Sequence, residues 1–226
     1  MCDKKAVNCL HYAAYRIFRA VMKPLFLLLF RPVIVDAERI PESGAAVLAG
    51  NHKHALDPIL IDICTRRVVR TLAKKDLHDG AFGFFFRAVG TIPVDLHAAS
   101  NPDALRAAVE ALKDGSLVNV SPEAKRNYTD ELLLPFKYGA AAMSQRSGAP
   151  VIPYAITGDY HIFRGKRPTV TFGEPIFCRE PDLTSCNRAL YEAVGALLQS
   201  SADSTFLQSK HYTSFEEWRN RNGKTS

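Results

Sequence analysis

Two histidines and an aspartate stand close together in the stretch GNHKHALDP, residues 50–58, as His52, His54 and Asp57. A carboxylate that hydrogen-bonds one nitrogen of an imidazole fixes the tautomer of the ring and raises the basicity of the other nitrogen. A histidine held in this way can remove a proton from an alcohol as a general base. We therefore predict His52 as a catalytic base and Asp57 as its orienting partner, with His54 facing solvent. On this pair alone, an ordinary surface hydrogen bond is the alternative.

A second group of charged residues occurs in VSPEAKRN, residues 120–127, where Glu123 precedes Lys125 and Arg126. An arginine can hold a phosphate through two parallel hydrogen bonds, and a neighbouring carboxylate can keep the guanidinium in position. From these residues alone, two interpretations are open. The stretch is either a phosphate-binding turn or a charged turn in solvent.

Both groups follow short apolar stretches that are expected to fold into strands. Residues 45–50, AAVLAG, have the length of a buried strand, and the apolar residues from Pro58 onward indicate a helix. His52 therefore lies at a strand-to-helix junction, where α/β proteins often place chemistry. Strands are expected at residues 33–41, 45–50, 68–74, 116–120, 149–157 and 169–176, and helices at residues 58–66, 80–90, 101–115, 138–148 and 183–200. This alternation predicts an α/β fold, a single domain with a mixed, largely parallel sheet flanked by helices.

Residues 101–115 carry the clearest helix signal. Asn101 is the expected N-cap, Pro102 suits the first helical position, and Gly115 is the expected end. In the same way, Gly148 is expected to end the helix that precedes it.

The N-terminal segment LHYAAYRIFRAVMKPLFLLLFRPVIV, residues 10–35, is strongly apolar but contains several basic residues. Its charge-free runs are shorter than the roughly 18 apolar residues that a membrane-spanning helix needs, and the basic residues lie where a signal peptide would be apolar. Arg16, Arg19 and Lys23 would share one face of a helix. Pro24 is expected to end this helix, and the apolar residues after it would form a second one.

This pattern predicts a helical pair that lies in the membrane interface, with its basic face against anionic lipid headgroups. The alternative is an ordinary amphipathic helix packed on its own domain. We expect residues 1–35 to be this membrane-interfacial segment, residues 36–200 the main domain and residues 201–226 a C-terminal tail. The protein is expected at the cytoplasmic face of a membrane, as a peripheral or monotopic protein.

The composition of the 226-residue chain restricts its partners and its environment. A formal net charge of +6 favours an anionic partner, but 23 acidic residues dilute the basic ones. No basic stripe typical of nucleic-acid binding remains, so no nucleic-acid partner is expected. The five cysteines lack the short paired spacings of a zinc site or a disulfide framework. We therefore expect a reducing environment, no disulfide framework and no metal site.

Four stretches occur in the order and at the spacings of four motifs of the glycerolipid acyltransferases. They are NHKHALD, GTIPVD, SPEAKR and APVIPYAI, and they begin at residues 51, 90, 121 and 149. Over residues 15–200 the sequence resembles the 1-acylglycerol-3-phosphate acyltransferase family. A histidine and an aspartate at this spacing are common by chance, whereas four ordered motifs are not.

The resemblance implies acyl transfer from an acyl thioester, on acyl-CoA or acyl carrier protein, to the sn-2 hydroxyl of 1-acylglycerol 3-phosphate. The product would be phosphatidic acid in phospholipid biosynthesis. The thioester is a substrate, so no cofactor is expected. His52 would be the base and Asp57 its partner, with Glu123 and Arg126 at the phosphate of the acceptor. By similarity, five residues would bind the substrates: Gly90, Thr91, Glu123, Lys125 and Arg126.

The motifs depart from the family pattern at two places. Ala124 and Lys125 stand where the third motif usually has Gly-Thr, and Leu96 stands where the second motif usually ends in arginine. These changes support a second hypothesis, in which the acceptor is another lysophospholipid or lipid. A third hypothesis is a catalytically inactive lipid-binding protein of the same fold, although such a protein would have no need of His52 and Asp57.

Overall fold

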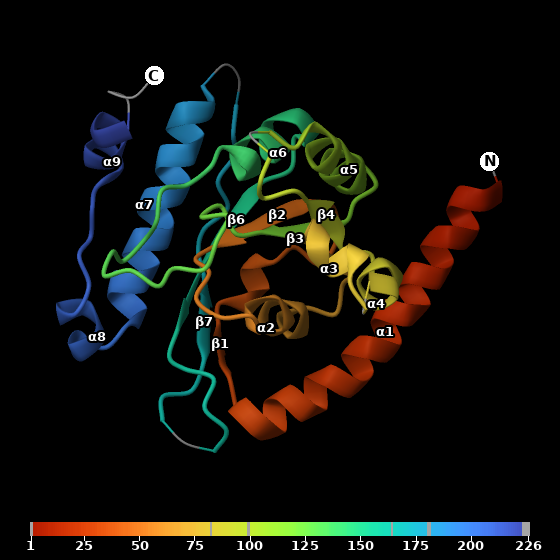
Figure 1. The fold of residues 1–226 in the computed structure, drawn as a ribbon, viewed down its shortest axis with the longest axis horizontal. Helices are drawn as coiled ribbons and strands as arrows, with labels where there is room; N and C mark the ends of the chain where they lie inside the picture. Colours follow the sequence, from red (N-terminus) through yellow and green to blue (C-terminus); the bar gives the residue numbers. More distant parts are fainter. Residues whose placement is uncertain (1, 82, 99, 164, 180–181, 223–226) are drawn as a thin grey trace.

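A seven-stranded sheet forms the centre of the computed structural model (Figure 1). The structure describes residues 2–81, 83–98, 100–163, 165–179 and 182–222, with side chains from residue 13 to residue 221. The strands are β1 (Val33–Val35), β2 (Ala46–Gly50), β3 (Val69–Lys74), β4 (Ile92–Val94), β5 (Leu117–Val120), β6 (Val151–Thr157) and β7 (Thr169–Phe172). Their order is β1-β7-β6-β2-β5-β3-β4. All neighbours are parallel except β6 and β7, which are antiparallel, so the predicted mixed, largely parallel sheet is confirmed.

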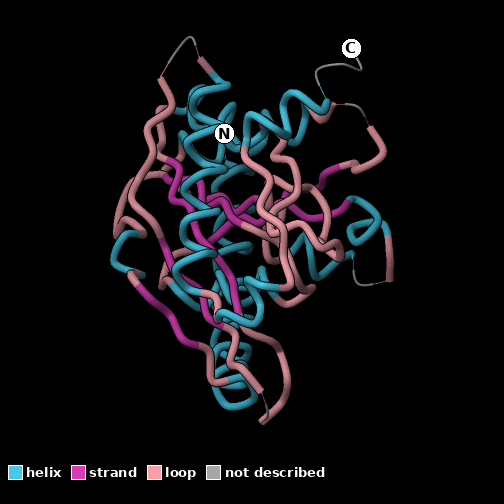
Figure 2. The backbone as a smooth tube through the Cα atoms, turned by 90° about the vertical axis from the view of Figure 1, so that its left-hand side faces the viewer, coloured by secondary structure: helices cyan, strands magenta, loops and turns pink. Residues whose placement is uncertain are grey.

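Helices cover both faces of this sheet, and the tube in Figure 2 shows the strands crossing the middle of the molecule. Side chains alternate between the two faces along β2: Val47 and Ala49 pack with α5, α6 and α7, whereas Ala46 and Leu48 pack with α1 and α2. The helices are α1 (Cys2–Phe30), α2 (Asp57–Cys64), α3 (Lys75–Asp79), α4 (Gly83–Ala88), α5 (Pro102–Lys113), α6 (Gly139–Ser147), α7 (Leu183–Ser201), α8 (Ser204–Gln208) and α9 (Phe215–Asn222).

Several elements differ from the sequence prediction. The strand expected at residues 33–41 ends at Val35 and is followed by a short 3-10 helix, Ala37–Arg39. β4 and α3 were not predicted, because each is too short to show a periodic pattern. The segment 201–226 contributes α8 and α9, and Phe215 in α9 is buried in the core beside α7.

The sequence signals at the start of α5 and at the end of α6 have different outcomes in the structure. Asn101 occupies the N-cap position of α5, but its side chain makes no capping hydrogen bond. It instead accepts a hydrogen bond from the Asp95 N–H and donates one to the Asp95 carbonyl, both at 2.8 Å, and so holds the preceding loop. Gly148 ends α6 with φ 76°, as predicted, because glycine tolerates the left-handed region.

The N-terminal segment forms one continuous helix, α1, with Pro24 inside it, so the predicted helical pair is wrong. Proline removes the hydrogen bond to the carbonyl four residues earlier, that of Ala20. Ala20 and Pro24 are both exposed, so water can satisfy that carbonyl without a break in the helix. Within the described ranges, no helix combines the length and the apolar character that crossing a bilayer requires.

The structure joins Cys178 and Cys186 in a disulfide, with Cα atoms 5.3 Å apart. The five scattered cysteines were expected to form no disulfide framework, in a reducing environment. Cys178 follows β7, and Cys186 lies in the first turn of α7. A single disulfide is not a framework, but it does not fit the reducing environment that was expected.

Candidate active site

The candidate active site lies at the carboxyl ends of two parallel strands in the middle of the sheet. His52 follows β2, and Glu123 follows β5, its parallel neighbour. Loops after adjacent parallel strands leave the sheet at the same edge, which is where open α/β sheets commonly bind their ligands. The two charged groups that the sequence analysis selected are thereby brought together.

His52 and Asp57 form the predicted pair. The His52 Nδ1 lies 2.9 Å from the Asp57 Oδ2, because the chain turns into α2 between them and Asp57 is its first residue. The same oxygen accepts the backbone N–H groups of Lys53 at 2.8 Å and His54 at 2.7 Å. With Asp57 only 2% exposed and its oxygen held by three groups, the carboxylate has a fixed position. The Nε2 of His52 makes no hydrogen bond within the described part of the chain.

Tyr160 binds the second oxygen of Asp57, and no pattern in the sequence indicated this residue. Its hydroxyl donates a hydrogen bond of 2.6 Å to the Asp57 Oδ1. Burial, together with the nearby Asp57 charge, raises the pKa of Tyr160 above its ordinary value, so the group keeps the proton that it donates. The exposed His54 ring stacks on the Tyr160 ring with centroids 4.5 Å apart. His54 thus faces solvent as expected and also covers the tyrosine.

Tyr160 also connects the pair to the N-terminal helix. The rings of Phe26 and Phe30, in the last turns of α1, lie 6.0 Å and 5.8 Å from the Tyr160 ring in edge-to-face arrangements. Phe26 is buried. The end of α1 therefore contributes to the packing that positions Asp57.

Glu123 holds the backbone of His52. One carboxylate oxygen accepts the His52 N–H and the other accepts the Leu134 N–H, both at 2.8 Å. Burial raises the pKa of Glu123 to about 7, and the two N–H groups and the His52 ring oppose that shift. On its other side, the His52 carbonyl accepts the Asn127 N–H at 2.9 Å. The loop of residues 121–127 thus binds both the N–H and the carbonyl of His52.

The structure does not bring Glu123 and Arg126 into an ion pair. Glu123 points inward, whereas Lys125 and Arg126 are exposed and the Arg126 guanidinium lies 5.4 Å from the ring centroid of Tyr128. Of the two interpretations of this turn, the one in which Glu123 holds an arginine is not what the structure shows, because both Glu123 oxygens already bind backbone groups. That Glu123, Lys125 and Arg126 bind a substrate stays a prediction. Ala124 has φ 57°, a left-handed conformation that costs alanine more than the usual glycine of the third motif.

Residues of the fourth motif hold Gly50 and Asn51, the two residues that precede His52. The Asn51 side chain donates to the Ile156 carbonyl at 3.0 Å and accepts the Ile156 N–H at 2.7 Å, which extends the pairing of β2 with β6. A Cβ on Gly50 would lie 2.2 Å from the Tyr154 carbonyl oxygen, so only glycine allows this close approach. Motifs far apart in sequence therefore support one loop.

Residues of the second motif lie before and along β4. Gly90 has φ 76°, and the Thr91 hydroxyl donates to the Phe86 carbonyl at 2.9 Å and lies 3.0 Å from the His78 Nε2. Burial lowers the pKa of His78. These contacts give Thr91 a role in holding α3 and α4. A contact between either residue of this pair and a substrate stays a prediction.

A cavity lies near the pair, although neither His52 nor Asp57 lines it. A cavity of ≈ 250 Å3 is lined by Lys53, next to the histidine, and by residues from the end of β6 and from α8. The Lys53 ammonium donates to the Gly158 carbonyl and lies 3.3 Å from the Asp159 carboxylate. Among the described residues, no cluster of three or more histidine, cysteine, aspartate or glutamate side chains is arranged to hold a metal ion.

Several known proteins are similar to this chain in sequence. The 1-acyl-sn-glycerol-3-phosphate acyltransferase of Bacillus subtilis is 26% identical over 148 residues, which are 63% of this chain and 72% of that protein. The Saccharomyces cerevisiae protein of the same name is 31% identical over 63% of this chain and 47% of its own length. Human 1-acyl-sn-glycerol-3-phosphate acyltransferase beta is 24% identical over 61% and 50%. The chain spans about half the length of the yeast and human relatives.

The fold also has a solved counterpart. The crystal structure of PlsC, the 1-acyl-sn-glycerophosphate acyltransferase of Thermotoga maritima, matches 89% of this chain and 83% of its own with a TM-score of 0.65. At 23% identity, this likeness shows the fold alone. The Acyltransferase family profile matches residues 31–157, which are more than half of the chain and contain all four motifs in full. The chain therefore belongs to the Acyltransferase family.

Proposed function

We propose that the protein transfers a fatty acyl group from an acyl thioester to the sn-2 hydroxyl of 1-acylglycerol 3-phosphate and so makes phosphatidic acid. The observation that carries this proposal is the His52–Asp57 pair, with Nδ1 on the buried carboxylate and Nε2 making no hydrogen bond to any described residue. The names of the relatives from Bacillus subtilis and Saccharomyces cerevisiae support this substrate. Acyl-CoA and acyl carrier protein are the two donors to compare.

The chemistry follows from the geometry. Nε2 of His52 accepts the proton of the acceptor hydroxyl as its oxygen attacks the thioester carbonyl carbon. The carbon–sulfur bond then breaks, and the imidazolium returns the proton to the leaving thiolate. Asp57 stabilises the imidazolium through Nδ1, and the hydrogen bond from Tyr160 keeps the carboxylate oriented. Such base catalysis typically contributes roughly 10²- to 10⁴-fold in rate.

Lys125 and Arg126 are the proposed ligands of the acceptor phosphate. Both side chains are exposed, and neither has a carboxylate partner within the described part of the chain. The hydrogen bond from Asn127 to the His52 carbonyl places this turn beside the base. A phosphate held here would lie close to the hydroxyl from which His52 takes the proton.

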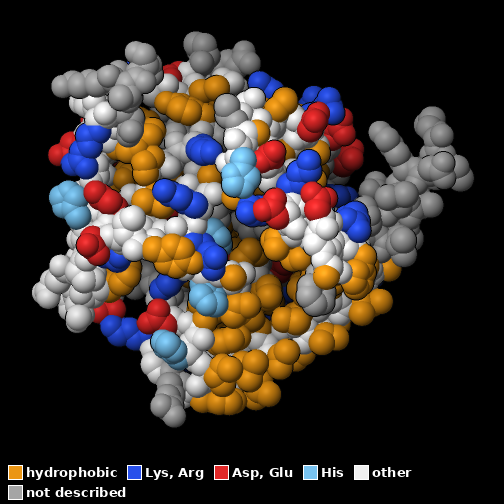
Figure 3. All heavy atoms as spheres, in the orientation of Figure 1, with side chains coloured by type: hydrophobic (Ala, Val, Ile, Leu, Met, Phe, Trp, Pro, Cys, Tyr) orange, Lys and Arg blue, Asp and Glu red, His pale blue; other side chains and the backbone are white. Residues whose placement is uncertain are grey.

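A peripheral position at a membrane, on its cytoplasmic face, is part of the proposal. Ile17, Val21, Leu25 and Leu28 form an exposed apolar row on α1, and Figure 3 shows hydrophobic side chains gathered along the course of this helix. A row of this kind suits the interfacial region of a bilayer, from which a lysophospholipid acceptor would come.

The acceptor is tested with a panel of lysophosphatidic acid, lysophosphatidylglycerol, lysophosphatidylcholine and glycerol 3-phosphate, each with labelled acyl-CoA and acyl carrier protein. We expect lysophosphatidic acid to be preferred. Arg126→Ala and Lys125→Ala should each raise the acceptor KM roughly tenfold or more, the equivalent of about 1.5–3 kcal/mol for a charge-assisted hydrogen bond. The donor KM should change little.

Arg146→Ala, which removes an exposed arginine from α6, is the matched control and should leave both KM values unchanged. A preference for a lysophospholipid with a larger headgroup would favour the second candidate function, acylation of another lysophospholipid. The exposed Leu96, in place of an arginine, is the observation behind that candidate. No transfer to any acceptor would favour an inactive lipid-binding protein.

A further inference from the structure

A second cavity, of ≈ 800 Å3, lies at the opposite edge of the sheet from His52. It is bounded by α1 and by residues that precede β3 and β5, namely Val68, Gly115 and Ser116. Because β2, β3 and β5 are parallel, their amino ends lie at one edge and the catalytic loops at the other. The cavity is therefore separate from the candidate active site.

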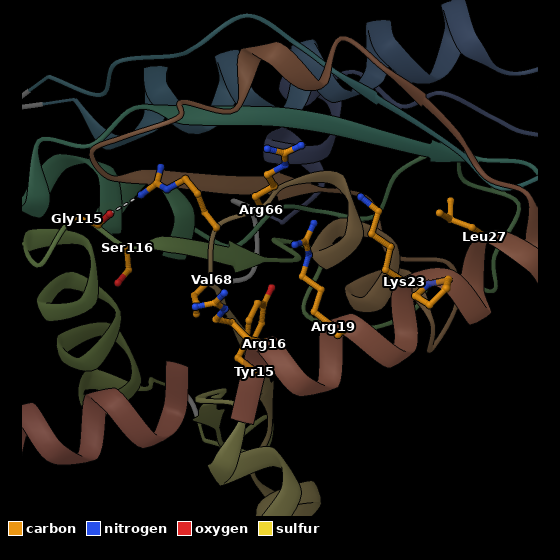
Figure 4. Close-up of a pocket in the computed structure, with 12 residues that line it drawn as sticks. Tyr15, Arg16, Arg19, Lys23, Leu27, Arg66, Val68, Gly115 and Ser116 are labelled. Carbon is orange, nitrogen blue, oxygen red and sulfur yellow. Dashed lines mark hydrogen bonds between the residues drawn. The ribbon is translucent and has the colours of Figure 1, made fainter. Parts of the chain in front are cut away.

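Cationic side chains dominate the cavity, and Figure 4 shows Arg19 and Lys23 extending from α1 toward Arg66. They come from one face of α1 and from the turn after α2, and they are Arg16, Arg19, Lys23, Arg66 and Arg67. Two of them bind neutral carbonyl groups: Arg19 donates to the Asp62 carbonyl at 3.2 Å, and Arg67 donates to the Pro41, Gly44 and Gly115 carbonyls. The bond from Arg19 to a neutral carbonyl fixes its guanidinium without cancelling its charge.

Carboxylates do little to offset this charge. Among the described side chains, Arg16, Lys23 and Arg66 form no ion pair. Asp62 is the buried acid beside Arg19, and burial raises its pKa to about 8, with the Tyr15 hydroxyl and Arg19 partly opposing that shift. Near neutral pH, Asp62 is therefore mostly protonated. The cavity thus carries a concentrated positive charge that an anion would neutralise.

The exposed aliphatic side chains of α1 lie on two sides of the helix. Ile17, Val21 and Leu28 belong to the exposed row, with 68%, 60% and 65% of their surfaces accessible, and helix geometry puts this row on the far side of α1 from the cavity. Leu27, also exposed, lines the cavity itself. The cavity side of α1 therefore combines cations with an exposed aliphatic side chain, as expected where a charged headgroup and its acyl chains bind together.

We propose that this cavity binds the phosphate of an anionic glycerophospholipid, with the acyl chains leaving the cavity past Leu27. This lipid is a bound component of the membrane and is not the acceptor that reacts at His52. Its phosphate lies among Arg19, Lys23 and Arg66. The cavity volume leaves room for a glycerol headgroup as well as the phosphate.

The test uses the full chain and flotation with phosphatidylcholine vesicles, with and without phosphatidylglycerol. Arg66→Ala and Lys23→Ala should each weaken binding to the phosphatidylglycerol vesicles roughly fivefold, the effect of one cation near a membrane surface, and the double variant roughly 25-fold. Arg66→Lys should recover most of the binding. Arg146→Ala removes an equal charge from α6 on the other face of the sheet and should leave binding within about twofold.

A second measurement identifies the site and the source of the phosphate. Phenylglyoxal modifies accessible arginines, and mass spectrometry of the peptides reports Arg66 separately. Phosphatidylglycerol vesicles should protect Arg66, whereas phosphatidylcholine vesicles and inorganic phosphate should not. Equal protection by inorganic phosphate would overturn the lipid assignment in favour of a free anion. Equal weakening by Arg66→Ala and Arg146→Ala would overturn the site altogether. No step of the test involves acyl transfer, so its result is independent of the proposed reaction.

Discussion

Two aspartates of α2 are buried, one at its first residue and one in its last turn, and their hydrogen-bond partners differ. Asp57, at the first residue of the helix, has hydrogen-bond partners on both oxygens: the Lys53 and His54 amides and the His52 ring on Oδ2, and the Tyr160 hydroxyl on Oδ1. Asp62 lies five residues later. Its Oδ1 has no hydrogen-bond partner within the described part of the chain, and its pKa is raised to about 8 by burial.

This difference separates burial from function. Burial alone does not make a carboxylate useful, since an isolated buried acid takes up a proton and loses its charge. Hydrogen-bond donors around a carboxylate favour its charged form, and a charged Asp57 is what the imidazolium of His52 needs. The proposed chemistry therefore belongs at the end of α2 where donors converge, and Asp62 is expected to affect stability and local charge instead.

The largest expected effect comes from exchanging each acid for its amide. Asp57→Asn should lower kcat for acyl transfer by roughly 10²- to 10⁴-fold, because the amide cannot stabilise the imidazolium and favours the wrong tautomer. Asp62→Asn should keep most of the activity. Acyl-transfer kinetics of the two variants, with thermal unfolding measured in parallel, check this contrast.

His54→Ala serves as a further control, because His54 is exposed and its ring stacks on Tyr160. It should retain most of the activity. Comparable losses of kcat in Asp57→Asn and Asp62→Asn, with both proteins folded, would remove the distinction between the two ends of the helix.

A smaller effect is expected from Tyr160→Phe, which removes one donor from Asp57 and leaves the aromatic packing in place. A hydrogen bond to a charged group is worth about 1.5–3 kcal/mol, so kcat should fall roughly 10- to 100-fold with little change in either KM.

The matched control is Tyr128→Phe, since Tyr128 is 75% exposed and lies on the neighbouring loop. It should leave kcat unchanged. A fall in thermal stability of Tyr160→Phe without any change in kcat would mean that the tyrosine only packs.

The smallest expected effect is on the way the free energy of unfolding depends on pH. The pKa of Asp62 is about 8 in the folded protein and near its ordinary, lower value in the unfolded chain, so the unfolded chain loses this proton first. The free energy of unfolding should therefore fall as the pH rises from about 5 to 8. Glu123, with a pKa of about 7, contributes in the same direction.

Urea unfolding at several pH values checks this. Asp62→Asn should make the dependence on pH shallower and leave the part that comes from Glu123. Asp130→Asn, at an exposed acid, should keep the wild-type slope. A slope that Asp62→Asn does not change would show that this acid is ionised in the folded protein, which would also remove part of the charge argument for the large cavity.

Local signals in the sequence predicted those elements whose own residues determine them. The strand of residues 45–50 and the helix ended by Gly148 depend on runs of apolar residues and on a glycine in the left-handed region, and both are where they were expected. His52 and Asp57 were found because a turn into a helix brings together residues only five positions apart. These features need no knowledge of the tertiary structure.

Other features depend on distant contacts that no local pattern carries. Tyr160 lies 103 residues from Asp57 and belongs to none of the four motifs. The inward orientation of Glu123 depends on the Leu134 N–H, which reaches the carboxylate only after the chain has folded back. Pro24 suggested a break in α1, and the exposure of Ala20 allowed the helix to continue.

The hydrogen bonds between the 121–127 loop and His52 also limit which insertions, deletions and substitutions the loop can accept. Glu123 and Asn127 bind the amide and the carbonyl of a single residue, so the three residues between them have to complete the turn. An insertion or deletion there would shift the base, whereas substitutions at Lys125 or Arg126 would leave it in place. Directed evolution of a new acceptor preference could therefore randomise these two positions at constant loop length without disturbing the catalytic histidine.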